Sequence, residues 1–94
     1  MRPMLDYGAA MTKPDKLYRQ LLASTSRSIS FRDFERLIVA FGFDLRRTRG
    51  SHRHYVHPKV PTVLTINPDK AQAHRYQIRL LLELVEQYAL HIEA

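Results

Sequence analysis

The spacing of apolar residues changes twice along this chain, and that change constrains the fold more than any other feature. From Phe31 to Phe41 apolar side chains recur every three or four residues, which is typical of an amphipathic helix. Between residues 43 and 66 the spacing falls to two, or to short runs rich in β-branched residues, which indicates strands. Helical spacing returns after residue 70. The chain therefore predicts a helix, a set of strands and a second helix around one core.

Capping and turn residues give the expected bounds of these elements. Pro14 suits the first turn of a short extra helix, and Ser30 is expected to cap the next helix, which ends at Gly42. Helices are predicted over residues 14–24, over residues 31–41, and from residue 71 or 74 to residue 90. Strands are predicted over residues 43–49, 52–57 and 62–66, joined by turns at residues 50–51 and 58–61.

This order of elements predicts a small α+β fold. A three-stranded antiparallel sheet would carry helices from both ends of the chain on one face and leave its other face free. Which residues face the helices stays open. If Val56 and Ile66 point inward, His54 is drawn in, whereas if Tyr55 points inward, Arg53 is drawn in.

Length bounds the domain organisation. A chain of 94 residues is enough for one modest core. Residues 1–13 are expected to form a flexible N-terminal tail, with Met11 as an alternative start, and residues 14–94 to form a single domain. The chain has no cysteine, which excludes disulfides and thiolate chemistry and favours a cytoplasmic location. We expect neither a membrane span nor a secretory signal.

Basic residues are concentrated in the second half of the chain. The segment 46–79 holds eight basic residues and one acid, a balance of +7, whereas the rest of the chain has a balance of −1. The basic residues of this segment are Arg46, Arg47, Arg49, Arg53, Lys59, Lys70, Arg75 and Arg79. Such a separation of charge indicates a surface that binds phosphate groups, as in a nucleic acid.

Histidines in the same segment are the candidates for chemistry. His52 follows the Gly50–Ser51 turn among several arginines, and this positive charge favours a neutral imidazole that can accept a proton. A neutral imidazole that takes the 2′-OH proton of RNA, with guanidinium groups to stabilise charge on phosphorus, would suffice for a ribonuclease without metal. The general acid stays open among His54, Lys70 and water. His52 and His54 could also begin a zinc site, but a third ligand is lacking and the arginines repel a dication.

The run of residues 38–58, IVAFGFDLRRTRGSHRHYVHP, resembles the HicA family of toxins from toxin–antitoxin systems. The similarity lies in Gly42-Phe43 at a helix end, a strand, the tripeptide Gly50-Ser51-His52 and the aromatic Tyr55. It continues more weakly to about residue 90 and covers roughly residues 31–90. The chain departs from the family at residues 67–70, NPDK, in place of a Pro-x-His element, and at Ala89 in place of a glycine.

The resemblance implies a fold like the double-stranded-RNA-binding domain, with the order α-β-β-β-α. It also implies an endoribonuclease that cleaves mRNA, a HicB-like antitoxin as partner, and His52 as the catalytic residue. No cofactor or metal is expected. Together with the basic segment, it gives an expected set of RNA-binding residues: Arg46, Arg47, Arg49, Ser51, Arg53, His54 and Lys70. The alternative is a non-catalytic RNA-binding module of the same fold, which grips the backbone only.

Overall fold

A computed structural model describes residues 13–24, 28–68 and 70–93 of the chain. The helices are α2 (Pro14–Ala23), α3 (Phe31–Ala40) and α4 (Arg75–Gln87), and the strands are β1 (Asp44–Arg49), β2 (His52–His57) and β3 (Val60–Ile66). The predicted α+β fold, α-β-β-β-α with an extra helix before it, is confirmed, and it is consistent with a double-stranded-RNA-binding-domain-like fold. The predicted tail falls mostly on residues 1–12, which lie outside the described residues.

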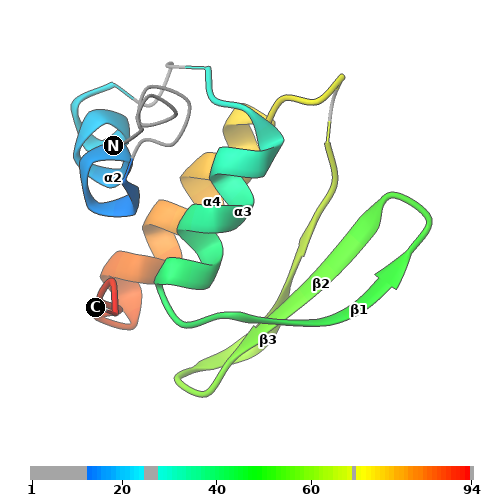
Figure 1. The fold of residues 1–94 in the computed structure, drawn as a ribbon. Coiled ribbons are helices and arrows are strands. Elements are labelled where there is room, and N and C mark those ends of the chain that lie inside the picture. The colour runs from blue at the N-terminus through cyan, green and yellow to red at the C-terminus, as the bar shows by residue number, and fades with distance from the viewer. Residues whose placement is uncertain (1–12, 25–27, 69, 94) are drawn as a thin grey trace, which may run out of the picture.

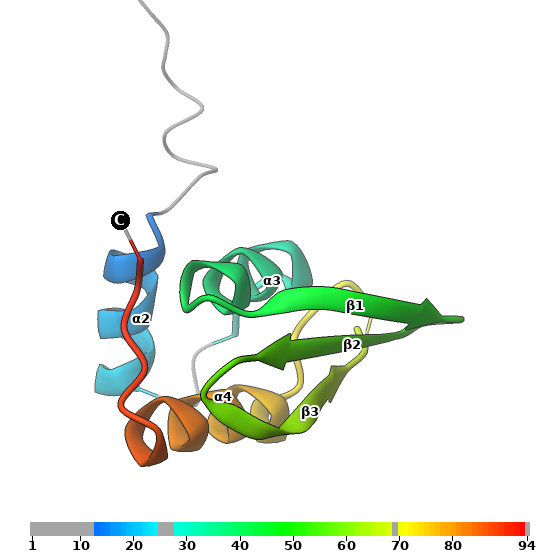
Figure 2. The ribbon, with the colours of Figure 1, turned by 90° about the horizontal axis from the view of Figure 1, so that it is seen from below.

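The elements form two layers. The strands make one antiparallel sheet in the order β1-β2-β3, and α3 and α4 lie together against one face of it (Figure 1). The extra helix α2 packs on the far side of these two helices, away from the sheet (Figure 2). No described helix covers the opposite face of the sheet (Figure 1). As the order of elements predicts, the described helices therefore leave one side of the sheet uncovered.

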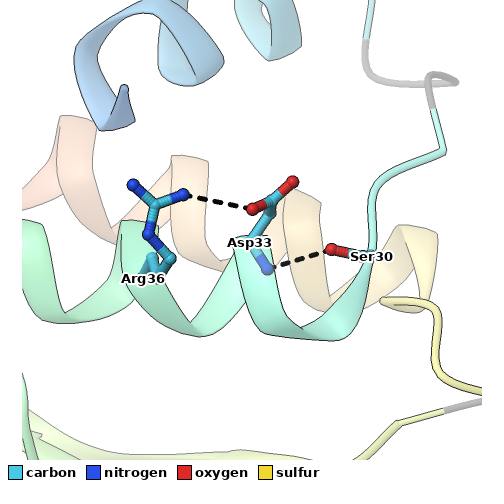
Figure 3. Close-up of polar contacts among 3 residues, drawn as sticks. All are labelled: Ser30, Asp33 and Arg36. Atoms are coloured by element: carbon cyan, nitrogen blue, oxygen red, sulfur yellow. Dashed lines mark hydrogen bonds and ion pairs between the residues drawn. The ribbon is translucent and has the colours of Figure 1, made fainter. Parts of the chain in front are cut away.

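The predicted cap of α3 is present. The Ser30 hydroxyl accepts a hydrogen bond of 3.1 Å from the Asp33 backbone N–H, and the Asp33 carboxylate pairs with Arg36 at 3.1 Å (Figure 3). Asp33 therefore places a negative charge in the first turn, where the helix dipole favours it. At the other end, Gly42 adopts a φ of +97°, the left-handed conformation that ends a helix at little cost.

A core of apolar side chains joins the two layers. Its fully buried members are Leu21, Phe34, Leu37, Ile38, Phe41, Phe43, Leu64, Ile66, Ile78 and Leu81. The sheet contributes Leu64 and Ile66 from β3 and the ring of Tyr55 from β2. On α4, Leu84 is buried, whereas Leu80 is exposed. The helical layer thus buries the face of the sheet that carries Tyr55.

The registers of the two ladders decide which side chains share a face. In the β1–β2 pair, Leu45 lies opposite Tyr55 and Arg47 opposite His54, so that Arg46 is an extra residue. In the β2–β3 pair, the register places Ile66 opposite Arg53 and Leu64 opposite Tyr55. Ile66 therefore lies on the Tyr55 face and not on the Val56 face, which settles the choice that the sequence left open.

The second turn is shorter than predicted. We expected residues 58–61 to form the turn and β3 to begin at Thr62, but Val60 already pairs with His57. Pro61 therefore lies inside the strand. This is possible because β3 is an edge strand, where a missing N–H on the outer side costs no ladder hydrogen bond.

The last helix ends earlier than predicted, at Gln87. Ala89 adopts a φ of +52°, and the backbone N–H of Leu90 bonds the Val85 carbonyl at 2.9 Å. The chain then turns back toward α3, where the N–H of Glu93 bonds the carbonyl of Ala40 at 2.8 Å. Leu90 remains buried, so its apolar character reflects the core although the residue lies beyond the helix.

Candidate nucleic-acid interface

The uncovered face of the sheet carries most of the residues predicted to bind RNA. Successive side chains of a strand point to opposite faces, and Tyr55 points toward the helices, so His52, His54 and Val56 point away from them. Arg47 and Arg49 lie opposite His54 and His52 in the β1–β2 ladder and share their face. This group, Arg46, Arg47, Arg49, His52 and His54, is called the outer-face cluster below.

The extra residue in β1 increases the positive charge on this face. A strand without the bulge would place Arg46 and Arg47 on opposite sides. With it, both arginines and Arg49 line one shallow hollow of about 320 Å³. The other residues that line it are His54, Val56, Val63 and Thr65. The hollow thus combines three guanidinium groups and an imidazole with the apolar side chains of Val56 and Val63.

His54 is held in place by its neighbour on β3. Its ring Nδ1 lies 2.9 Å from the hydroxyl Oγ1 of Thr65, the residue opposite it in the ladder. The side chain is half-buried. No hydrogen bond of the other ring nitrogen, Nε2, is found in the described part of the chain. Thr65 was not predicted as a site residue, because only the register of β3 brings it to His54.

His52 lies at the edge of the cluster, where β2 begins. Gly50 adopts a φ of +58° in the turn that connects β1 to β2, and Ser51 completes that turn. His52 and Ser51 are exposed, and no side-chain hydrogen bond of either is found over the described residues. Arg49, also exposed, is the ladder partner of His52. A phosphate group held by Arg49 would therefore lie within reach of the imidazole.

Arg53 lies on the opposite face and makes a different set of contacts. Its guanidinium pairs with the Glu35 carboxylate on α3 and lies 5.3 Å from the centre of the Phe31 ring. Glu35 also accepts a hydrogen bond of 2.7 Å from the Tyr55 hydroxyl. The hydrogen bond with Glu35 raises the pKa of Arg53, and burial raises the pKa of Tyr55 above its ordinary value. Arg53 thus ties the sheet to α3 and is not brought together with the outer-face cluster.

His57, a further histidine of β2, contacts only groups within the fold among the described residues. It is buried, and its ring packs edge-on against Phe43 at 5.0 Å. Its Nε2 lies 3.0 Å from the carbonyl of Phe41, which can only accept, while Nδ1 accepts from the backbone N–H of Lys59. Both ring nitrogens are therefore used by one neutral tautomer.

Lys70 also lies away from the outer-face cluster. It is exposed, adopts a φ of +53°, and does not line the hollow. It begins a short segment that pairs with the residues before α3, where the Phe31 N–H bonds the Ala71 carbonyl at 2.9 Å. The structure therefore separates the predicted site residues into three groups: the outer-face cluster, the exposed turn residue Ser51 next to it, and two outliers, Arg53 and Lys70.

No group of three or more His, Cys, Asp or Glu side chains in the described part of the chain could hold a metal ion. None of the helices described has the length and apolar run that crossing a membrane requires.

Comparison with known proteins identifies the family. A family model described as the HicA toxin of bacterial toxin–antitoxin matches residues 31–86, which run from the start of α3 into α4. No curated protein and no solved structure shows a significant match to the chain. The matched range contains the whole outer-face cluster and covers more than half of the 94 residues. The chain therefore belongs to the HicA family of bacterial toxin–antitoxin toxins, as its Gly-Ser-His motif and order of elements predict.

Proposed function

We propose that this protein is an RNA-binding endoribonuclease that cleaves mRNA on the uncovered face of its sheet, and that it is the toxin of a type II toxin–antitoxin pair. The observation that carries the proposal is the outer-face cluster, in which Arg46, Arg47 and Arg49 share one exposed sheet face with His52. Guanidinium groups in this arrangement suit phosphate oxygens, which they can bind through two parallel hydrogen bonds.

The proposed chemistry uses the 2′-hydroxyl of RNA as the nucleophile. His52, as general base, would take the 2′-OH proton while the oxygen attacks the adjacent phosphorus. Arg47 and Arg49 would stabilise the negative charge that develops on the phosphoryl oxygens. Because His52 is exposed at the start of β2, an RNA backbone can approach it without a change in the fold.

A HicB-like antitoxin is the proposed partner, and the cytoplasm the proposed location. The exposed arginines of the outer face would attract an acidic partner surface, which would then exclude RNA from the same residues. A second candidate function is RNA binding without cleavage, since the three arginines that line the hollow can grip a phosphate backbone with no chemistry.

An RNA cleavage assay separates these candidates. We compare the unaltered protein with His52→Ala in the presence of EDTA, and use His91→Ala, an exposed histidine beyond α4, as the matched control. We expect the unaltered protein and His91→Ala to cleave RNA, and His52→Ala to cleave it at least about 100-fold more slowly. Products should end in 2′,3′-cyclic phosphate. Equal cleavage by His52→Ala would contradict the role of His52, and binding without cleavage by all three would support the second candidate.

A further inference from the structure

We propose that His54 is a second catalytic residue, an inference that rests on the proposed cleavage of RNA. It would act as the general acid that protonates the leaving 5′-oxygen, with Thr65 positioning its imidazole. His54 follows His52 by two residues on β2, and both side chains point away from the helices. It also lines the hollow that Arg46, Arg47 and Arg49 share.

The spacing of the two histidines suits a displacement at phosphorus. Alternate residues of a strand lie roughly 6.6 Å apart along its axis. In such a displacement the attacking and leaving oxygens are roughly in line on opposite sides of phosphorus. A phosphate between the two imidazoles would therefore present its 2′-oxygen to one and its 5′-oxygen to the other.

The contact with Thr65 gives His54 an orientation that His52 lacks. A threonine hydroxyl at 2.9 Å can accept the hydrogen of Nδ1. With Nδ1 used in this way, Nε2 is the ring nitrogen left to deliver a proton.

The other proton donors near the hollow fit this role less well. Arginine side chains stay protonated, so Arg46, Arg47 and Arg49 cannot give up a proton to the leaving group. Lys70 does not line the hollow. His57 is buried, with both ring nitrogens engaged. His54 is the imidazole that lines the hollow with the arginines.

His52 and His54 together account for both proton transfers of the cleavage reaction. The bond from the 2′-oxygen to phosphorus forms as the bond from phosphorus to the 5′-oxygen breaks. The 2′-OH proton passes to His52, and the imidazolium of His54 gives its Nε2 proton to the 5′-oxygen. The products are a 2′,3′-cyclic phosphate and a 5′-hydroxyl. Proton exchange with water then returns both histidines to their starting forms.

A sulfur substitution at the leaving group tests this assignment. A site cleaved by the unaltered protein is mapped first, and an RNA oligonucleotide is then made with sulfur in place of the 5′-oxygen at that site. A thiolate leaves without needing a proton, so loss of the general acid should matter little on this substrate. We expect His54→Ala to slow cleavage of ordinary RNA about 100-fold or more, but to cleave the sulfur substrate within about ten-fold of the unaltered protein. His52→Ala should be slow on both.

Thr65 has its own variants in the same assay. Thr65→Val removes the hydroxyl and should slow cleavage of ordinary RNA but not of the sulfur substrate, whereas Thr65→Ser should restore ordinary cleavage. His91→Ala is the matched control, and circular dichroism and RNA binding verify the fold of each variant. If the unaltered protein cleaves RNA but His54→Ala is equally slow on both substrates, or unaffected on both, the assignment of His54 is overturned and the proposed function stands. If the unaltered protein cleaves no RNA, the proposed function fails and this assignment fails with it.

Discussion

Gly42 and Ala89 occupy the same position after two different helices. Each follows the C-terminal cap residue, has a positive φ, and belongs to a motif in which the next backbone N–H bonds a carbonyl five residues earlier. Glycine adopts this conformation freely, but alanine brings its Cβ close to the following carbonyl oxygen, at a cost of roughly 1 kcal/mol. The end of α4 is therefore less favourable than the end of α3.

Exchange of the two residue types should have opposite effects on stability. Ala89→Gly should raise the free energy of unfolding by about 0.5–1 kcal/mol, because the left-handed conformation then carries no steric cost. Gly42→Ala should lower it by more than this amount. There the new Cβ would also lie 2.9 Å from Glu93 Oε2 and 3.0 Å from His57 Nε2. Urea unfolding measures both, and a stabilising Gly42→Ala would contradict this account.

Tyr55 should make the protein less stable in alkali. Burial, and next the hydrogen bond to Glu35, raise the pKa of its phenol above the ordinary value of 10.0. As the pH rises past about 10, the unfolded phenol loses its proton while the folded one keeps it. The free energy of unfolding must therefore fall by up to about 1.4 kcal/mol per pH unit from this group. Tyr55→Phe should show a shallower decline between pH 9.5 and 11.5 in urea unfolding, and identical slopes would rule out the effect.

The helix α2 is an extra element that precedes the α-β-β-β-α fold. It lies before the range that matches the family model, and it packs through buried Leu17 and Leu21, with the ring of Tyr18 edge-on to Phe41 at 5.0 Å. None of its residues lines the hollow of the outer-face cluster. We therefore assign it to stabilising the helical layer and not to the site.

Substitutions on two faces of α2 test that assignment. Leu21→Ala should lower the free energy of unfolding by about 2–4 kcal/mol, since it leaves a cavity at a fully buried position. The neighbouring Leu22 is exposed, so Leu22→Ala should change stability by less than about 0.5 kcal/mol. At a temperature where both variants are folded, each should bind RNA like the unaltered protein. Weaker RNA binding by folded Leu21→Ala would show that α2 contributes to the site.

The elements differ in how well the sequence predicts them. The start of α3 follows from Ser30 and its end from Gly42, because caps are local signals. The start of β3 was misplaced, because whether Pro61 can lie in a strand depends on the strand being at an edge. The faces of β1 were also unpredictable. The bulge at Arg46 exists only in the pairing with β2, and it decides where Arg47 points.

In the candidate site, too, local sequence signals predict some residues, whereas contacts between elements decide the placement of others. The Gly-Ser-His motif and the basic segment located His52 and three of the arginines, because both signals are local in sequence. Arg53 is separated from them by its pairing with Glu35 on α3, a contact between residues 18 positions apart. The link between His54 and Thr65 likewise needs the register of two strands.

At the scale of the whole molecule, positive charge lies on two different sides. Arg46, Arg47 and Arg49 line the hollow on the uncovered face of the sheet, whereas Arg75 and Arg79 lie on α4, in the helical layer. A protein with this fold could bind RNA from either side. We expect the sheet side to bind it, because His52, His54 and the hollow lie there.

Two pairs of substitutions with equal loss of charge show which side of the molecule binds RNA. We compare Arg47→Gln/Arg49→Gln with Arg75→Gln/Arg79→Gln, and measure binding to a 2′-O-methylated RNA, which cannot be cleaved by attack of a 2′-OH, over a range of salt concentrations. We expect the sheet pair to weaken binding ten-fold or more and to reduce the slope of log K against log salt by about 1–2. The α4 pair should bind within about three-fold of the unaltered protein. The reverse result, a large loss for the α4 pair and little for the sheet pair, would place the RNA on the helical side and contradict the account.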